Sequence, residues 1–531
     1  WKINLQTKDG RHWYDVSVSA ADGQILNFAD WASNAAYNVY ALPKEGPNDG
    51  PRTIAINPQD SVASPFGWHD TDGVAGPEFT ITSGNNVNAY TDRDNDDVAD
   101  PGSAPDGGAT LTFDFPIDPA QPPSTYSDAA VTNLFYWNNI LHDVHYQYGF
   151  DEAGGNFQFN NYGRGGLGGD PVEAQAQDGA DIGDSDNANM FTPPDGMSPR
   201  MQMYEFTATT PRRDSDLDAG VMVHEYGHGV SNRLTGGPAD ANALQTPESR
   251  GMGEGWSDFW TLMFSQQPSD QQGDAYGIGT YVLGEPADGP GIRNYPYSFD
   301  LAIDPQTYGD IASTNVPHGV GEIWAAALWD MNWLLINGVP NVVPGHGFSS
   351  DLYRGTAGNN IAFGLVMNGL KLQPANPTML EGRDAILLAD QALTGGANQI
   401  AIWTAFARRG MGFSANDGGD SNNLNVTPAF DLPPRLIPGP GLQLIAVTPN
   451  EGDLYEPNRV NVREIGPSEL IFRFDANDDL DATTLDGIQI TRAGQDGDFE
   501  FASASTDFGT NGQVYVEFTA QQLGLGGNDI A

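Results

Sequence analysis

The chain of 531 residues contains no cysteine, so disulfide bonds cannot stabilise it, and its stability must come from a packed core and bound ions. Basic residues are also scarce: 23 Lys and Arg stand against 70 Asp and Glu, which gives a net charge of −47. Nucleic acids and anionic membrane surfaces attract proteins through clusters of Lys and Arg, so we expect neither as a partner.

Long apolar runs are missing too. The nearest candidate for a membrane span, residues 324–343, is interrupted by Asp330, Asn332, Asn337 and Pro340. A spanning helix needs about 20 predominantly apolar residues, so we expect no membrane span. With 39% hydrophobic and 10% aromatic residues, the chain still has the composition of a globular protein.

The order of sequence patterns predicts an α+β protein made of several units. Residues 1–30 alternate apolar and polar side chains around a turn, and short strands follow between about 40 and 125. Helical patterns then dominate, at 128–149, 217–234, 253–266, 318–335, 361–372, 380–394 and 398–409. A Pro-rich linker at 432–440 precedes alternating segments in 441–531 that are typical of a small β-sandwich.

The segment 221–228 contains the pattern His-Glu-x-x-His in an apolar helical setting. Side chains four residues apart lie on one face of a helix, so His224 and His228 can reach the same ion. Glu225 lies beside them, where its carboxylate can take a proton from a water that the metal activates. The alternative is a helix whose histidines make only local hydrogen bonds, but the pattern favours metal binding in a chain with 8 histidines.

A catalytic zinc ion takes three protein ligands and keeps one position open, so a third ligand is required. A histidine six residues after His228, as metzincin proteases have, is excluded because Leu234 stands there. Downstream, Glu254 starts a predicted apolar helix, and Asp258 follows one turn later, where it can accept a hydrogen bond from a ligand histidine. The spacing leaves a second interpretation of Glu254 equally open, as a solvated carboxylate at a helix start.

Several motifs together resemble those of the fungalysin metallopeptidases, a family related in its catalytic core to thermolysin. They cover about residues 36–420 and lie at 63–69, 142–143, 155–158, 192–196, 224–228, 251–259 and 293–297. The resemblance implies a secreted zinc endopeptidase made as a zymogen. It also implies the two-lobed gluzincin fold, with a β-rich N-terminal lobe, a helical C-terminal lobe and the active-site helix between them.

The resemblance assigns roles by position. It marks His224, His228 and Glu254 as zinc ligands and Glu225 as the general base. His318, in the polar first turn of a predicted helix, would donate a hydrogen bond to the developing oxyanion. A histidine that makes only a local bond there is the alternative.

Substrate contacts follow from the same resemblance. In the related enzymes an Asn-Ala pair on an edge strand holds the substrate backbone, and Asn187 and Ala188 match it. An Asx turn is the alternative interpretation. The tyrosine that assists catalysis in thermolysin has no clear counterpart before Glu254, and Tyr295 or Tyr297 are candidates to replace it.

We accordingly expect five segments. They are the end of an inhibitory propeptide (1–35), the β-rich lobe (36–216), the helical lobe (217–431), the linker (432–440) and an Ig-like β-sandwich (441–531). The last segment lies outside the resemblance, and its ending shortly after a predicted strand suggests a truncated domain.

A further metal site is a weaker expectation. Asp92, Asp94 and Asp96 place carboxylates at alternating positions, as calcium loops do. The glycine and terminal glutamate of an EF-hand are missing, so a solvated charged run is favoured and a structural Ca²⁺ site is the alternative. His142 and His145 have helical spacing, but they lie in the apolar pattern 128–149 and are expected to pack.

The sequence therefore predicts a secreted zinc endopeptidase that acts on proteins or peptides. One alternative is a zinc aminopeptidase with the same ligands, but we find no motif that would bind a free amine. The other is a surface or adhesion protein with a vestigial protease module. The intact ligand and base residues argue against this second alternative.

Overall fold

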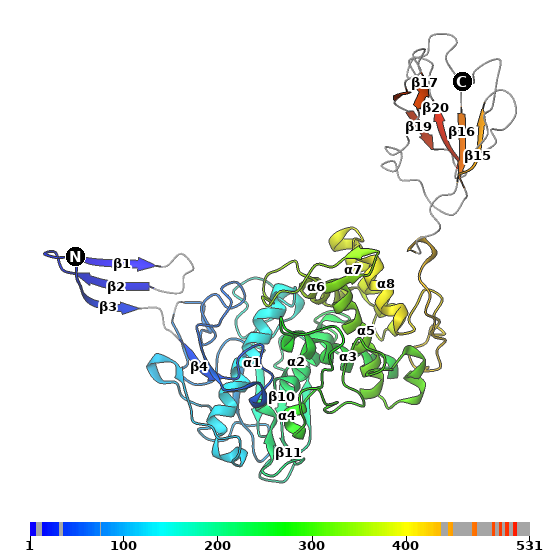
Figure 1. Ribbon diagram of the computed structural model, residues 1–531. Helices are drawn as coiled ribbons and strands as arrows, with labels where there is room; N and C mark the ends of the chain where they lie inside the picture. The colour runs from blue at the N-terminus through cyan, green and yellow to red at the C-terminus, as the bar shows by residue number, and fades with distance from the viewer. Residues whose placement is uncertain are drawn as a thin grey trace. The chain divides into compact units, whose positions relative to one another are not determined.

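The structure is a computed structural model of the chain (Figure 1). It describes residues 1–6, 13–30, 35–74, 76–436, 444–449, 470–474, 491–493, 499–501, 505–508 and 513–517. The chain divides into two compact units, Trp1–Leu432 and Pro433–Ala531, and each is described by itself.

Strands of the larger unit lie mainly in its first half. They are β1 (Lys2–Gln6), β2 (Trp13–Val18), β3 (Ile25–Asp30), β4 (Ala36–Val39), β5 (Thr53–Ile56), β6 (Val87–Thr91), β7 (Thr112–Phe113), β8 (Val172–Ala176), β9 (Ala188–Phe191), β10 (Arg200–Met203), β11 (Glu205–Phe206), β12 (Arg213–Asp214), β13 (Gly338–Val339) and β14 (Val343–Pro344). β1–β3 form an antiparallel sheet, and β5, β4 and β7 form a mixed sheet in which β4 pairs with β5 antiparallel and with β7 parallel. The four-stranded sheet, with the order β6-β8-β10-β9, matters for the site because β9 lies at its edge and pairs only with β10.

Helices dominate the second half of this unit, and one long helix, α1 (Ser127–Gln147), lies in its first half. The others are α2 (Ala219–Leu234), α3 (Pro247–Ser265), α4 (Thr280–Leu283), α5 (His318–Asn337), α6 (Gly358–Leu372), α7 (Met379–Thr394) and α8 (Gln399–Arg408). α5 is apolar on nearly all sides, so it is buried along its length and packs against α3, α6 and α8. α3 packs against both α2 and α5 (Figure 1). The mixed α+β class expected from the sequence is confirmed, and the two-lobed layout stays a prediction.

One helix boundary differs from the expectation. α3 begins at Pro247 instead of near 253, so Glu254 lies inside the helix and not at its start. Thr246 caps this earlier start: the Ser249 hydroxyl accepts a hydrogen bond from its backbone N–H at 3.0 Å, and Pro247 fits the first helical position. The glycines at 251, 253 and 255 hide this start because they lower the helix propensity of the sequence.

Two of these glycines, Gly251 and Gly255, allow a close approach of α3 and α5. A Cβ atom on Gly255 would lie 2.5 Å from the carbonyl oxygen of Gly321 and 2.9 Å from Cβ of Trp324. A Cβ atom on Gly321 would in turn collide with Cβ of Glu254. The small residues therefore set the distance between the two helices at the level of Glu254.

The smaller unit contains β15 (Leu444–Pro449), β16 (Leu470–Phe474), β17 (Thr491–Ala493), β18 (Phe499–Phe501), β19 (Ser505–Phe508) and β20 (Gln513–Glu517). These strands form a sheet with the order β15-β16-β20-β19 and a separate pair, β17-β18, all antiparallel. The Ig-like sandwich stays a prediction, because most of 441–531 lies outside the described residues. The same is true of 437–440 in the predicted linker and of 7–12 and 31–34 in the predicted propeptide segment.

Within the described part of the chain, no helix combines the length and the apolar character that a membrane crossing requires.

Replacing Gly255 by alanine should weaken the contact of α3 with α5. We expect the free energy of unfolding to fall by about 1–3 kcal/mol, the usual cost of overpacking a core. The matched control is Gly253→Ala on the same helix, where a Cβ would meet no atom within 4 Å. Urea denaturation should show the control to be neutral or up to about 1 kcal/mol more stable, whereas equal losses in both variants would contradict the packing argument.

Candidate metal centre

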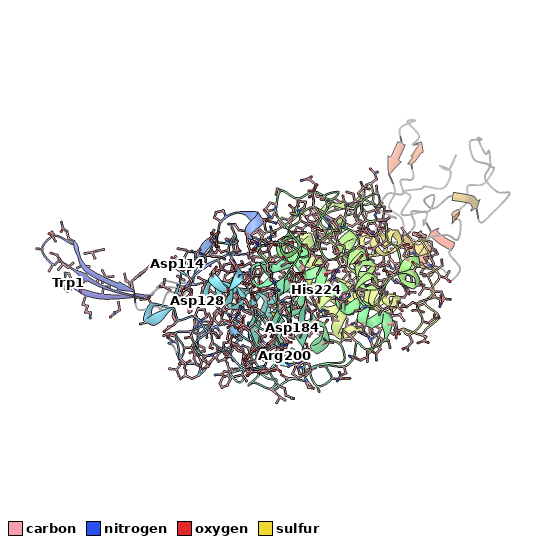
Figure 2. All side chains as sticks on the ribbon, turned by 90° about the horizontal axis from the view of Figure 1, so that it is seen from below. Trp1, Asp114, Asp128, Asp184, Arg200 and His224 are labelled. Atoms are coloured by element: carbon pink, nitrogen blue, oxygen red, sulfur yellow. The ribbon has the colours of Figure 1, made fainter. Side chains whose placement is uncertain are left out.

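α2 carries three of the predicted site residues. Asp218 caps its start by accepting a hydrogen bond from the backbone N–H of Gly220 at 3.0 Å. His224 and Glu225 are buried, and the side chain of His228 is 20% exposed. In Figure 2, His224 lies amid the side chains of the larger unit. The helix thus presents these three groups from within the protein and not from its surface.

α3 brings Glu254 to the two histidines. The Nε2 atoms of His224 and His228 are 3.1 Å apart, and Oε2 of Glu254 lies 3.2 Å and 3.9 Å from them. Ligands about 2.0–2.1 Å from a tetrahedral ion are separated by about 3.3 Å, close to these distances. Oε2 of Glu254 is buried and has no hydrogen-bond donor among the described residues, so it suits a metal ion.

Asp258, one turn after Glu254, fixes the orientation of His224. Its Oδ1 accepts a hydrogen bond from Nδ1 of His224 at 2.7 Å, which leaves Nε2 free to face Glu254. The guanidinium of Arg293 binds the same carboxylate in a bidentate manner, at 2.6 and 2.7 Å, and the hydroxyl of Tyr297 donates to it at 2.5 Å. All the donors thus hold one fully buried carboxylate in a single position.

The electrostatics of this cluster favour a positive charge between its members. Burial alone would raise the pKa of Glu254, yet His228 and His224 lower it to about 2. Burial would lower the pKa of His224, but its hydrogen bond to Asp258 and its contact with Glu254 raise it to about 10. Both shifts show that the carboxylates of Glu254 and Asp258 attract positive charge to the space beside His224.

Glu225 lies at the wall of a cavity of about 470 Å³, which we call the main cavity because it is the larger of the two that border the candidate ligands. No described residue forms a hydrogen bond or an ion pair with its carboxylate, and burial raises its pKa to about 7. The same cavity is bordered by His224, His318, Asn187, Ala188 and Arg293. The geometry thus places a buried carboxylate, free of protein partners, next to the candidate ligands.

The structure brings the remaining predicted residues to the same place. Nε2 of His318, the first residue of α5, lies 3.7 Å from Oε2 of Glu254, and its side chain is 54% exposed. Ala188 begins the edge strand β9, with Asn187 directly before it. The open edge of the four-stranded sheet therefore borders the main cavity.

A sequence profile described as fungalysin metallopeptidase (M36) matches residues 36–415, more than two thirds of the chain. The chain belongs to the fungalysin metallopeptidase family. The resemblance seen in the motifs is thereby confirmed.

Curated relatives of this fungalysin carry the name extracellular metalloproteinase. The protein of Aspergillus fumigatus is 42% identical over 433 residues, 78% of this chain and 64% of the relative. That of Leptosphaeria maculans is 40% identical over 450 residues, 82% of this chain and 66% of the relative. This chain thus spans just under two thirds of the length of these relatives.

Two earlier expectations are refined by the geometry of this fungalysin. Tyr297 is buried with its hydroxyl on Asp258 and does not border the main cavity, so it is not available to act on a substrate. His142 and His145 are both buried in α1: Nδ1 of His142 lies 2.9 Å from Oδ1 of Asp143, and Nδ1 of His145 donates to the carbonyl of Leu141 at 2.7 Å. Both histidines pack in the core, as expected.

The acidic run at 92–96 forms hydrogen bonds within its own loop. The carboxylate of Asp92 accepts hydrogen bonds from the backbone N–H groups of Asp96 and Asp97, at 3.1 and 2.9 Å. The carboxylates of Asp92, Asp94 and Asp96 lie within 4.8 Å of one another, yet the last two are exposed. The alternative of a calcium site therefore gains no support, and the solvated run remains the favoured interpretation.

Arg293 is the important group that sequence reasoning missed. It borders the main cavity and pairs with Asp258 across 35 positions of sequence, a separation without helical or strand periodicity. The only signal in the sequence was the position of this arginine in the motif 293–297, and the family resemblance assigned no role to it.

Replacing Asp258 by asparagine should weaken zinc binding by about 10- to 100-fold, because the new amide cannot orient His224 as the carboxylate does. Tyr297→Phe is the control: it removes one donor and leaves His224 and Arg293 on Asp258, so the zinc affinity of this variant should change less than tenfold. Competition with a chelator, below the melting temperature of each variant, measures the zinc affinity of both variants. An unaltered zinc affinity in Asp258→Asn would disprove the orienting role.

Proposed function

We propose that this chain is a secreted, zinc-dependent endopeptidase. The observation that carries the proposal is the convergence of His224, His228 and Glu254 on one point, with His224 at the wall of the main cavity that Glu225 also borders. Three ligands of this kind leave one position free for a reactant, which is the pattern of a catalytic zinc site and not of a structural one.

Two further findings support the proposal. The family description names metallopeptidases, and relatives with about 40% identity are named extracellular metalloproteinases. The scarcity of basic side chains and the acidic surface suit a protein that works in solution among soluble substrates.

In this proposal the two histidines of α2 and Glu254 of α3 hold the zinc ion. When bound, zinc acts as a Lewis acid that polarises a carbonyl group and lowers the pKa of water to near 7. Asp258 keeps the Nδ1 proton of His224, so that Nε2 remains the ligand atom.

Glu225 would act as the general base. Its carboxylate would accept a proton from the attacking water and then deliver it to the departing amine nitrogen. The burial that raises its pKa makes it a stronger proton acceptor than a solvated glutamate.

His318 would stabilise the oxyanion. It borders the same cavity as Glu225, and its exposed imidazole can rotate toward a bound carbonyl oxygen. A donor in this position strengthens its hydrogen bond as negative charge develops on that oxygen, and thereby lowers the barrier.

The substrate would bind as an extended strand along β9. Because β9 has only one partner strand, its other edge can accept the backbone of a peptide near Asn187 and Ala188. The apolar residues Phe206, Val221 and Ile292 border the cavity and suit an apolar side chain of the substrate.

The zymogen remains part of the proposal. Residues 1–35 precede the family match and contain the separate sheet β1–β3. We propose that they are the end of a propeptide that inhibits the enzyme until it is removed.

Glu225→Gln tests the catalytic proposal most simply. The amide cannot accept a proton, so kcat should fall by about 10²- to 10⁴-fold while the zinc content stays at one per chain. The substrate is an internally quenched peptide blocked at both ends, which an aminopeptidase cannot cleave. Addition of 1,10-phenanthroline should abolish cleavage, and added zinc should restore it.

Glu322→Gln provides the matched control. Glu322 borders the same cavity, but its carboxylate accepts hydrogen bonds from Asn294 and Gln306 and is not free to act as a base. The kcat of this variant should therefore fall less than tenfold. Near-native turnover by Glu225→Gln would refute the general-base role. No cleavage of the blocked peptide by the zinc-loaded wild type would refute the endopeptidase proposal and favour an aminopeptidase or a vestigial module.

A further inference from the structure

A second, smaller hollow reaches the candidate metal centre. Its volume is about 180 Å³, and His228, Glu254, Asn232, Gln245 and Arg250 border it. The main cavity meets the same centre through other residues, among them His224, Glu225 and His318. A peptide whose scissile bond lies at the metal can therefore contact the main cavity with one part and the second hollow with another.

The second hollow is rich in unused hydrogen-bond donors. Within the described part of the chain, the side chains of Asn232, Gln245 and Arg250 form no hydrogen bond or ion pair with any residue. Ser231, at the same hollow, donates its hydroxyl to the carbonyl of His228. The free groups are thus two amides and one guanidinium, all of which can donate to an oxygen ligand.

Arg250 is held in this hollow by the helix that carries the metal ligand. It lies four residues before Glu254 on α3, so the two side chains share one face of the helix. They form no ion pair, because Oε2 of Glu254 faces the two histidines, with Arg293 at 3.8 Å. Arg250 is exposed and keeps its positive charge available to a ligand.

The net charge of the protein explains why the guanidinium of Arg250 matters for an acidic substrate. A chain with a net charge of −47 repels an acidic peptide as it approaches, so such a peptide needs a local cation to bind. A guanidinium with neighbouring amide donors matches the geometry of a carboxylate. Glu254, the one acidic residue at this hollow, belongs to the candidate ligand set.

We propose that the second hollow binds a carboxylate of the substrate and that Arg250 determines this specificity. The inference rests on the proposed endopeptidase function and names a class of substrate for it: peptides with an acidic residue near the scissile bond, at the position that reaches the second hollow. The carboxylate is supplied by an Asp or Glu side chain or by the free C-terminus of a short peptide.

The test compares cleavage of quenched peptides that differ only in Glu or Gln, placed in turn at three positions on each side of the scissile bond. At one position the wild type should prefer Glu over Gln by about three- to tenfold in kcat/KM, the range of an exposed charged hydrogen bond. A parallel arm compares free and amidated C-termini, and so separates the two sources of the carboxylate.

Arg250→Gln should reduce the preference to about one, and Arg250→Glu should invert it in favour of Gln. The control is Arg354→Gln, which removes the same charge at a residue that borders neither hollow and should keep the wild-type ratio. Circular dichroism and zinc content establish that each variant is folded and loaded.

A preference at a side-chain position, or for the free C-terminus alone, that disappears in Arg250→Gln supports the inference and identifies the carboxylate. Equal cleavage of all pairs by the wild type, or a preference that survives in Arg250→Gln, overturns the inference and leaves the endopeptidase proposal intact. Failure of the wild type to cleave any of the peptides overturns both.

Discussion

The candidate metal centre depends on the close packing of α3 between α2 and α5. The histidines on α2 have their positions from the geometry of one helix, but Glu254 lies 26 residues after His228 and reaches them only because α3 lies beside α2. Gly227 of α2 allows α3 to approach α2, and Gly255 of α3 with Gly321 of α5 allows α3 to pack against α5, since a methyl group at these contacts would collide with the neighbouring helix. Core packing, and not local sequence, therefore brings the third ligand to the site.

Charge balance explains why the packed arrangement suits a divalent cation. With both histidines neutral, Glu225, Glu254 and Asp258 carry three negative charges, and Arg293 offsets one of them. The excess of two charges in a buried site is unfavourable unless a cation or protons are taken up. Against the effect of burial, the contacts of His224 with Asp258 and Glu254 raise its pKa to about 10, and burial raises the pKa of Glu225 to about 7, so both groups favour a proton. A divalent ion at the three candidate ligands would neutralise the same excess.

The sequence predicts the parts of this site that follow helical periodicity or a family motif. His224, Glu225 and His228 lie within one helix, and Asp258 follows Glu254 by one turn, so their relative positions follow from the geometry of α2 and α3. The start of α3 was missed because glycines that serve helix packing look like helix breakers in sequence. Arg293 was missed for a different reason: it contacts Asp258 through the tertiary fold and has no periodic relation to the ligands. Arg250 shares a helix face with Glu254, but the sequence does not show that its side chain lies at a hollow beside the ligands, and its proposed role depends on that position.

The central claim is that His224, His228 and Glu254 bind one zinc ion with a position left open. X-ray absorption at the zinc edge of the purified, active protein tests it directly. The account predicts one zinc per chain, with two imidazole nitrogens at about 2.0–2.1 Å and the remaining ligands oxygen. A spectrum without imidazole scattering, or cleavage of peptides by a protein free of bound metal, would contradict it.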